Sequence, residues 1–206
     1  MNPVIKKRFL YISLTWDGEN RFGGGVGTKI GLKDDGKQVL DWMDQKDIAL
    51  DFSHASDSLA DAILNYVDKK SLKIPLLASH SNARAITPLE RNLPDFLIKE
   101  IFTRKGLVGL NFFAPFIGDS STRLLEHIMH FFSLGGEHQL CFGADFFPDF
   151  TLSAYLQKKY GIKNGFFSEL GNASTYPKLL SFLQPHLSSK QLQGLAFKNF
   201  SSFLSD

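Results

Sequence analysis

The feature that most constrains the fold is a repeated alternation of short apolar runs with longer segments of helical period. The apolar runs lie at residues 9–16 (FLYISLTW), 48–54 (IALDFSH), 74–80 (IPLLASH), 107–113 (LVGLNFF) and 138–146 (HQLCFGADF). Each strand–helix pair takes roughly 26 to 38 residues, a length that suits a helical crossover between parallel strands. The runs are nearly continuous rather than alternating, as in strands that are covered on both faces. The sequence therefore predicts an α/β fold with about five parallel strand–helix units.

The helical segments between and after these runs have recognisable boundaries. Helices are expected at residues 37–47, 56–70, 93–106 and 121–136, followed by two terminal helices at 176–187 and 189–204. Ser56 or Asp57 is predicted to cap the second helix, and the third is predicted to end at Gly106. Ser188 or Ser189 is predicted to cap the last helix.

The helix at 121–136 contains two histidines three residues apart, His127 and His130. A crossover helix is expected to point away from the ends of the strands, so a structural role is predicted for both histidines. The core-facing residues predicted for this helix are Leu124, Leu125, Ile128 and Phe132.

Length, charge and cysteine content exclude several classes of protein. A chain of 206 residues suits one domain with a substantial core, so residues 1–206 are predicted to form a single domain. A formal charge of only +2 argues against nucleic acid or an anionic membrane as partner. The only cysteine, Cys141, excludes an intramolecular disulfide and is predicted to be a buried apolar residue in a cytoplasmic protein. No run approaches the roughly 18 apolar residues of a membrane span.

Two folds accommodate parallel strands with helical crossovers: an open doubly wound sheet and an eight-stranded barrel. Five units are too few to close the barrel. In either fold the functional groups gather at the carboxyl ends of the strands. The residues at those ends are Thr15-Trp16-Asp17, Ser53-His54, Ser79-His80, Asn111 and Asp145.

Two successive runs end on a Ser-His pair, at His54 and at His80. Neighbouring strands lie about 4.8 Å apart, so the two imidazoles are expected to reach one metal ion such as zinc. Asp145 is a candidate ligand or proton carrier for water bound to the metal. The alternative is that each histidine only caps a loop or bonds a backbone carbonyl.

Two further segments are candidate binding sites. The glycine-rich stretch at residues 23–27 (GGGVG) lacks the Lys and Ser/Thr of a phosphate-binding loop, so a flexible loop is predicted there. Arg91 lies in a loop near the same strand ends, where it is either solvated or forms a fork that binds a carboxylate.

The ordered motifs LDFSHAS, PLLASHSNAR, PLERNLPD and GADF, with YISLTW before them, resemble those of the membrane (renal) dipeptidase family of zinc metallopeptidases. That resemblance covers most of residues 8–150. It implies an eight-stranded α/β barrel with two zinc ions that hydrolyses dipeptides through a metal-bridging hydroxide. The present chain would then be a partial barrel of about five parallel units plus terminal helices.

The resemblance also implies a role for individual residues. His54 and His80 correspond to histidine ligands of zinc, and Asp145 to the acidic residue that handles the proton. Arg91 corresponds to the residue that holds the free carboxylate of the dipeptide. Trp16 stands where many members carry a histidine thought to steady the substrate carbonyl. From their places at strand ends, Trp16 and Asn111 are both predicted to bind substrate.

Two motifs of the family are not located in this sequence: the His-x-Asp pair of the first strand and the glutamate that bridges the two metals. We therefore expect a truncated or split chain with low activity alone, completed by an amino-terminal segment or a second chain. The alternatives are a non-catalytic remnant or binding module of the same fold, and another hydrolase of the amidohydrolase type.

Overall fold

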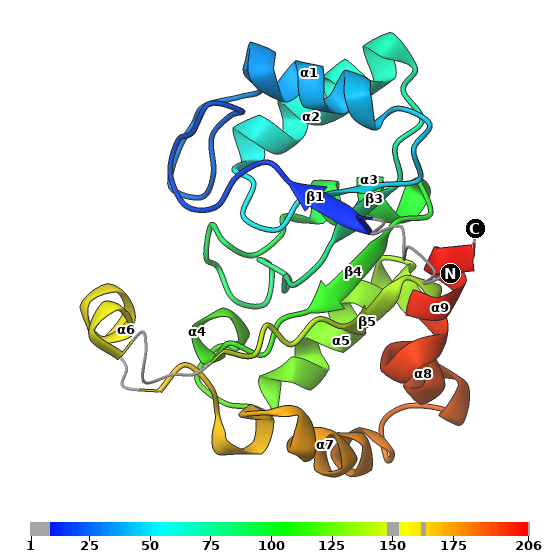
Figure 1. Ribbon diagram of the computed structural model, residues 1–206. Helices are drawn as coiled ribbons and strands as arrows, with labels where there is room; N and C mark the ends of the chain where they lie inside the picture. The colour runs from blue at the N-terminus through cyan, green and yellow to red at the C-terminus, as the bar shows by residue number, and fades with distance from the viewer. Residues whose placement is uncertain (1–8, 148–152, 162–163, 206) are drawn as a thin grey trace, which may run out of the picture. The chain divides into compact units, whose positions relative to one another are not determined.

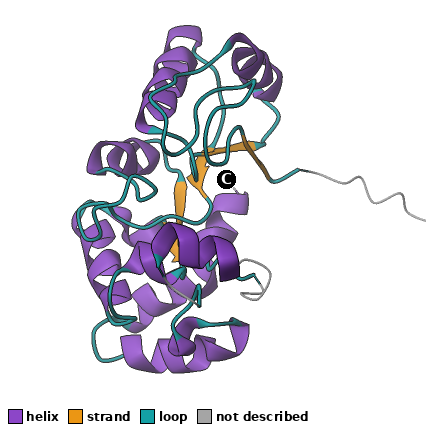
Figure 2. Cartoon of the chain, turned by 90° about the vertical axis from the view of Figure 1, so that its left-hand side faces the viewer, coloured by secondary structure: helices purple, strands orange, loops and turns teal. Residues whose placement is uncertain are grey.

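The structure is a computed structural model that describes residues 9–147, 153–161 and 164–205. The chain divides into two compact units, Met1–Leu77 and Ala78–Asp206, called unit 1 and unit 2 below. Each unit is described by itself. Both combine short strands with helices and long connecting loops (Figure 2).

Unit 1 contains three short strands in the order β1, β2, β3. Their bounds are Tyr11–Ser13 (β1), Ala49–Asp51 (β2) and Leu76–Ala78 (β3), the last of which ends at the boundary between the units. β1 and β2 pair in parallel with Tyr11 opposite Ala49, and β2 and β3 with Leu50 opposite Leu76. These strands confirm the first three predicted runs, and each is shorter than its run because residues at both ends of the run lie outside the strand.

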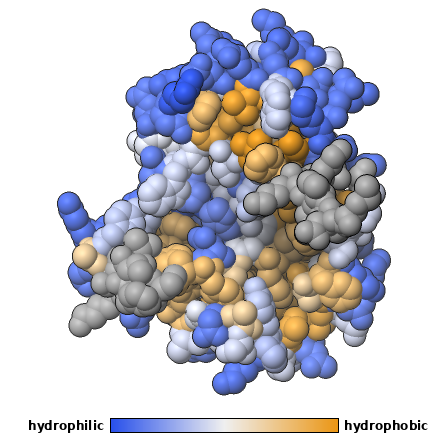
Figure 3. All heavy atoms as spheres, viewed as in Figure 1, coloured by the Kyte–Doolittle hydropathy of each residue, from blue (hydrophilic) through white to orange (hydrophobic). Residues whose placement is uncertain are grey.

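β1 lies at one edge of this sheet. Phe9 and Tyr11 are exposed to 65% and 43%, unlike the fully covered β2. Figure 3 shows an apolar (orange) area over this part of unit 1, bordered by hydrophilic (blue) side chains. The expectation of strands covered on both faces therefore holds for β2 but not for β1.

Two helices cover the sheet of unit 1, α1 (Asp34–Met43) and α2 (Asp57–Lys70) (Figure 1). The prediction for α1, residues 37–47, was displaced by about one turn. Asp34 and Asp35 occupy its first turn, where carboxylates interact favourably with the helix dipole. The helix ends before Gln45, whose backbone is left-handed (φ 57°).

Ser56 is the N-cap of α2, one of the two predicted alternatives. Its Oγ accepts the Leu59 N–H bond at 3.1 Å. We expect Ser56→Ala to lower the free energy of unfolding by about 1 kcal/mol, because a buried helix donor loses its acceptor. Chemical denaturation measures this loss. Ser58→Ala, inside the same helix, is the control, and an equal loss there would show that the cap is not the cause.

Unit 2 contains two paired strands, β4 (Leu107–Leu110) and β5 (Leu140–Phe142). They are parallel, with Val108 opposite Leu140, and all of β4 is buried. Both confirm the predicted runs. The α-helices before the carboxyl-terminal segment are α3 (Asp95–Thr103), α4 (Ala114–Ile117), α5 (Arg123–Ser133) and α6 (Ser153–Tyr160). Short 3₁₀ helices lie at η1 (Gly136–His138), η3 (Ser168–Leu170) and η4 (Ala173–Thr175).

The buried face of α5 differs from the prediction. Its buried residues are Leu124, His127, Ile128 and Phe131. Leu125 and the predicted Phe132 are only partly buried, because the helical period places Phe131 in line with Leu124 and Ile128. His130 lies at the margin of this face and bonds the Asp95 carboxylate of α3 at 2.8 Å.

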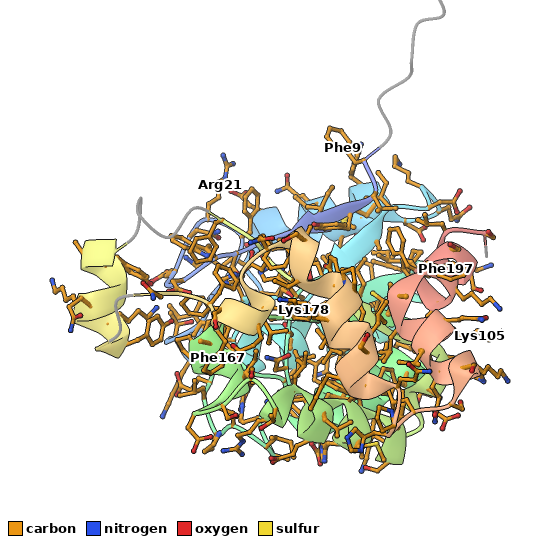
Figure 4. The ribbon with its side chains drawn as sticks, turned by 90° about the horizontal axis from the view of Figure 1, so that it is seen from below. Phe9, Arg21, Lys105, Phe167, Lys178 and Phe197 are labelled. Carbon is orange, nitrogen blue, oxygen red and sulfur yellow. The ribbon has the colours of Figure 1, made fainter. Side chains whose placement is uncertain are left out.

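The two predicted terminal helices are observed in altered form. The first is α7 (Tyr176–Leu183), and the second is a succession of α8 (Ser189–Gln193), the π-helical turn η5 (Gly194–Lys198) and α9 (Asn199–Ser205). Ser188 caps α8 and forms a capping box with Gln191. Phe197 on η5, labelled in Figure 4, is 53% exposed.

Asn199, at the start of α9, anchors this terminal segment on unit 2. Its Nδ2 donates to the carbonyl oxygens of Glu137 and Leu140 at 2.9 and 2.8 Å. The Cβ of an alanine at Gly194 would lie 3.0 Å from the Asn199 side chain. The π-helical turn thus directly precedes the residue whose buried side-chain amide bonds strand β5. The helical period of the sequence does not predict this contact.

Aromatic rings fill much of the core of unit 2. Phe112 contacts Phe142 and Tyr176 edge-on, at centroid distances of 5.5 and 5.9 Å. Cys141 is buried beside them, and burial raises the pKa of its thiol to about 12. Cys141 is therefore an apolar core residue, as predicted.

Candidate active site

Asn111 joins two strand ends of unit 2. It follows β4, is fully buried, and its Nδ2 donates to Asp145 Oδ2 at 3.2 Å and to the His80 carbonyl oxygen at 3.3 Å. Asp145 follows β5 and is exposed. One amide group of unit 2 thus links the residues that follow β4 and β5 to His80, all of them positions where the sequence predicted the functional groups to gather.

Arg91 belongs to the same cluster. Its side chain is buried, with only 6% exposure, so the solvated alternative is wrong. Nη1 donates to Ser81 Oγ at 3.0 Å and Nη2 to the His80 carbonyl oxygen at 2.9 Å. The guanidinium carbon lies 5.2 Å from the centre of the Phe116 ring. Unit 2 therefore brings together four predicted site residues: His80, Arg91, Asn111 and Asp145.

The imidazole of His80 is oriented by its neighbour. Nδ1 lies 2.7 Å from Ser79 Oγ, within hydrogen-bond distance. A polar group bonded to one ring nitrogen fixes the orientation of an imidazole, as it does for histidines that bind metals. The role of His80 as a metal ligand stays a prediction.

Asn82 holds the same segment through a reciprocal pair of bonds with Asn111. Asn82 Nδ2 donates to the Asn111 carbonyl oxygen at 3.0 Å, and Asn82 Oδ1 accepts from the Asn111 backbone N–H at 3.1 Å. Both residues are fully buried. Sequence reasoning missed Asn82, although a polar residue two positions after a strand-end histidine is a signal for such support.

Two glycines make room for the chain at Ser79. A Cβ at Gly109 would lie 2.2 Å from the Ser79 carbonyl oxygen, and a Cβ at Gly143 would lie 2.0 Å from it. Any other residue at either position would displace the backbone next to His80. Sequence reasoning also missed this pair, although a glycine inside or just after an apolar strand often marks a close approach of another backbone.

In unit 1, the ring and the carbonyl oxygen of His54 both contact neighbouring residues. Its Nδ1 lies 3.4 Å from Asp17 Oδ1, and its ring lies 6.0 Å from that of Trp16. Its carbonyl oxygen accepts from Val26 N–H at 2.9 Å and from Thr15 Oγ1 at 3.4 Å. Trp16 is 63% exposed, so its indole is accessible at this strand end.

The glycine-rich loop supports His54, so the prediction of a flexible loop was wrong. Gly23, Gly24 and Gly25 are buried, and Gly25 N–H donates to Gly18 O at 2.6 Å. A Cβ at Gly25 would lie 1.7 Å from the Trp16 carbonyl oxygen. The glycines therefore allow a close backbone approach beside Trp16 and His54.

Asp51, at the end of β2, supports the same strand end and was missed as a candidate. The carboxylate is buried, accepts from Ser13 Oγ at 2.7 Å and from Ser53 N–H at 2.9 Å. It thus fixes the turn that precedes His54. The signal was available, because a carboxylate inside a buried apolar run requires hydrogen-bond partners.

His54 and Asp145 share an unusual backbone conformation. Their φ angles are 70° and 60°, in the left-handed region that disfavours residues with a Cβ. Such conformations concentrate at functional sites, where the surrounding contacts maintain them. The same conformation occurs at Gln45, Ser71 and Lys105, just after α1, α2 and α3, so it is compatible with a functional role and with a loop-capping role.

A zinc centre fits these residues only in part. Imidazole is a suitable zinc ligand, and both His54 and His80 have one ring nitrogen close to a polar neighbour. However, the described residues contain no group of three or more His, Cys, Asp or Glu side chains that could hold a metal ion. Catalytic zinc sites use three protein ligands, so the described residues do not complete one.

These observations define a parallel α/β protein with polar groups clustered at its strand ends. Comparison with known proteins identifies the class. Residues 4–205 match the family model of the membrane dipeptidases, peptidase family M19. The chain belongs to this family of metallopeptidases.

Individual relatives are similar to parts of this chain. A protein of Acinetobacter calcoaceticus, described as an uncharacterized protein in the PQQ-III 3′ region, is 34% identical over 55% of this chain and 39% of its own length. An uncharacterized dipeptidase of Schizosaccharomyces pombe is 30% identical over 66% of this chain and 34% of its own. The chain thus spans less than half of these two relatives.

The fold likeness extends to solved structures. A metallopeptidase from Rhodobacter sphaeroides, crystallised with a phosphinate mimic of the dipeptide L-Ala-D-Ala, matches with a TM-score of 0.79 at 24% identity. That match covers 95% of this chain and 55% of the other. It supports the fold class of a partial α/β barrel. In the described part of this chain, no helix has the length and apolarity needed to cross a membrane.

Proposed function

We propose that this chain takes part in metal-dependent hydrolysis of dipeptides. The observation that carries the proposal is the bonded cluster of His80, Arg91, Asn111 and Asp145 at the strand ends of unit 2. The family to which the chain belongs supports the substrate class.

The residues of this chain have distinct tasks in the proposed reaction. Asp145 is exposed and held by Asn111, so it is placed to accept and return a proton. Arg91 supplies a positive charge for the terminal carboxylate of the dipeptide. Asn111 orients Asp145 at the substrate, and Trp16 forms an apolar wall at the strand end of unit 1.

Zinc is the metal we propose, with His54 and His80 as ligands that converge on one ion. When bound, it would act as a Lewis acid toward the peptide carbonyl. Because two histidines do not complete a catalytic site, we propose that the remaining ligands come from an amino-terminal segment or a second chain. We also propose a cytoplasmic location, which the single buried Cys141 supports.

The proposal is tested by zinc content and dipeptide hydrolysis. The purified chain alone is expected to have little activity with added zinc. Co-expression with a family segment that contains a His-x-Asp pair is expected to restore both bound zinc and hydrolysis. High activity of the chain alone would contradict the proposal that its zinc site is incomplete. Absence of activity in both preparations would contradict the proposed function.

Arg91→Lys tests the role of the guanidinium in substrate binding. Lysine keeps the positive charge but cannot form the two parallel hydrogen bonds of a guanidinium with a carboxylate. We therefore expect kcat/KM for a dipeptide to fall roughly ten- to a hundredfold in the active preparation. The matched substrate is the same dipeptide with a carboxyl-terminal amide, for which the fall should be much smaller. Equal losses for both substrates would show that Arg91 only supports the His80 segment.

A further inference from the structure

His127 on α5 is a fully buried histidine that the proposed reaction does not use. Its Nδ1 lies 3.1 Å from the backbone nitrogen of Ala83, in the loop that follows β3. Its Nε2 lies 3.0 Å from the carbonyl oxygen of Ile117, at the end of α4. Three segments distant in the sequence therefore meet at one imidazole.

The partners of the ring determine where its proton lies. A backbone N–H can only donate, so Nδ1 must accept the bond from Ala83 and carries no hydrogen. A carbonyl oxygen can only accept, so Nε2 carries the hydrogen and donates it to Ile117. Thr87 Oγ1 donates to the same carbonyl oxygen at 2.6 Å. One neutral tautomer satisfies the whole arrangement.

The bond to Ala83 completes the attachment of the segment Ser81–Ala83. Ser81 N–H donates to the Gly109 carbonyl oxygen at 2.7 Å, and Asn82 bonds Asn111 in both directions. The third residue, Ala83, is held by His127. This segment directly follows His80, and its Ser81 hydroxyl accepts a bond from Arg91.

We infer that His127 is a positioning residue, which fixes the segment Ser81–Ala83 by accepting the Ala83 N–H bond and thereby sets the places of His80 and Arg91. The effect on the backbone is independent of the reaction. Only its consequence for hydrolysis rests on the proposed function.

Two substitutions test the roles of the two ring nitrogens of His127 separately. Asparagine is short enough to place an amide oxygen near the position of Nδ1, so His127→Asn keeps an acceptor for Ala83. Glutamine places its amide near the position of Nε2, so His127→Gln keeps a donor for Ile117 and loses that acceptor. His130→Asn is the matched control, because His130 lies on the same helix and bonds Asp95 instead.

Amide hydrogen exchange of the purified chain measures the result. We expect exchange at Ala83 to become about tenfold faster in His127→Gln, and to stay near the wild-type rate in His127→Asn and His130→Asn. The Val108 amide, bonded to Gln139 O between β4 and β5, serves as the reference for overall opening of the fold.

Two outcomes would overturn the inference. One is an unchanged Ala83 rate in His127→Gln relative to Val108. The other is an equal acceleration in the Asn and Gln variants, which would indicate a general packing role. In the active preparation, kcat/KM should follow the same order, with the Gln variant lower than the Asn variant. A preparation without hydrolysis would count against the proposed function, while the exchange rates still decide the role of His127.

Discussion

Gly143→Ala is expected to lower the free energy of unfolding by about 3 kcal/mol and to abolish dipeptide hydrolysis in the active preparation. The added Cβ would lie 2.0 Å from the Ser79 carbonyl oxygen and 2.9 Å from Gly109 Cα. Both are backbone atoms, so no side chain can rotate away to relieve the contact. The backbone at Ser79 has to move, and His80 moves with it. Urea denaturation gives the loss of stability, and zinc content reports the loss of the ligand position.

Gly171→Ala is the matched control in the same unit, because its nearest neighbour would be 3.5 Å from the new Cβ. We expect that variant to stay within about 0.5 kcal/mol of the wild type. Gly109→Ala should resemble Gly143→Ala, since both new methyl groups meet the same carbonyl oxygen. The double variant should then lose less than the sum of the single losses. A stable, active Gly143→Ala chain would show that the path of Ser79 does not depend on this pair.

The stability of the chain is expected to fall as the pH drops from about 6.5 to about 4, because His127 is neutral in the folded state. Burial is the main cause that lowers the pKa of His127 from 6.5 to about 4, with smaller contributions from Arg123 and His130. The folded pKa is below the unfolded one, so the stabilising contribution is complete above pH 6.5 and is lost on acidification. The difference corresponds to about 3 kcal/mol at pH values below 4.

Carboxylates also titrate in this range, so the measurement must be a comparison. Between pH 6.5 and 4, we expect the free energy of unfolding of His127→Asn to fall less than that of the wild type, because the contribution of His127 is missing. The His130→Asn variant should retain the contribution of His127. Urea denaturation at several pH values between 4 and 7.5 gives both curves. Parallel curves for the wild type and His127→Asn would contradict a lowered pKa of this histidine.

Much of the architecture was predictable from sequence pattern. The five apolar runs became β1 to β5, and the helical segments between them became α1, α2, α3 and α5. These predictions succeeded because burial imposes a period on the sequence and polar residues mark where each strand ends. The exact ends were less predictable, as with the first turn of α1, because acidic residues at a helix start carry no apolar period.

The candidate site was predictable in its residue types and only partly in its contacts. The sequence placed His80, Arg91, Asn111 and Asp145 near one set of strand ends, and unit 2 brings these four together. The convergence of His54 with His80 on one ion stays a prediction. The buried Asp51 and Asn82 were missed although each had a local signal. Their partners Ser13 and Asn111 are distant in the sequence, so these contacts were not predictable.

For this protein, the sequence by itself determined the parallel α/β class, the strand ends and the family motifs, because these depend on local period and on residue chemistry. The tertiary structure alone decided that Arg91 is buried, that Gly109 and Gly143 accommodate Ser79, and that His127 binds Ala83. Each of these depends on atoms that are distant in the chain and meet only after folding, within hydrogen-bond or van der Waals distance. No pattern along the sequence records such a distance.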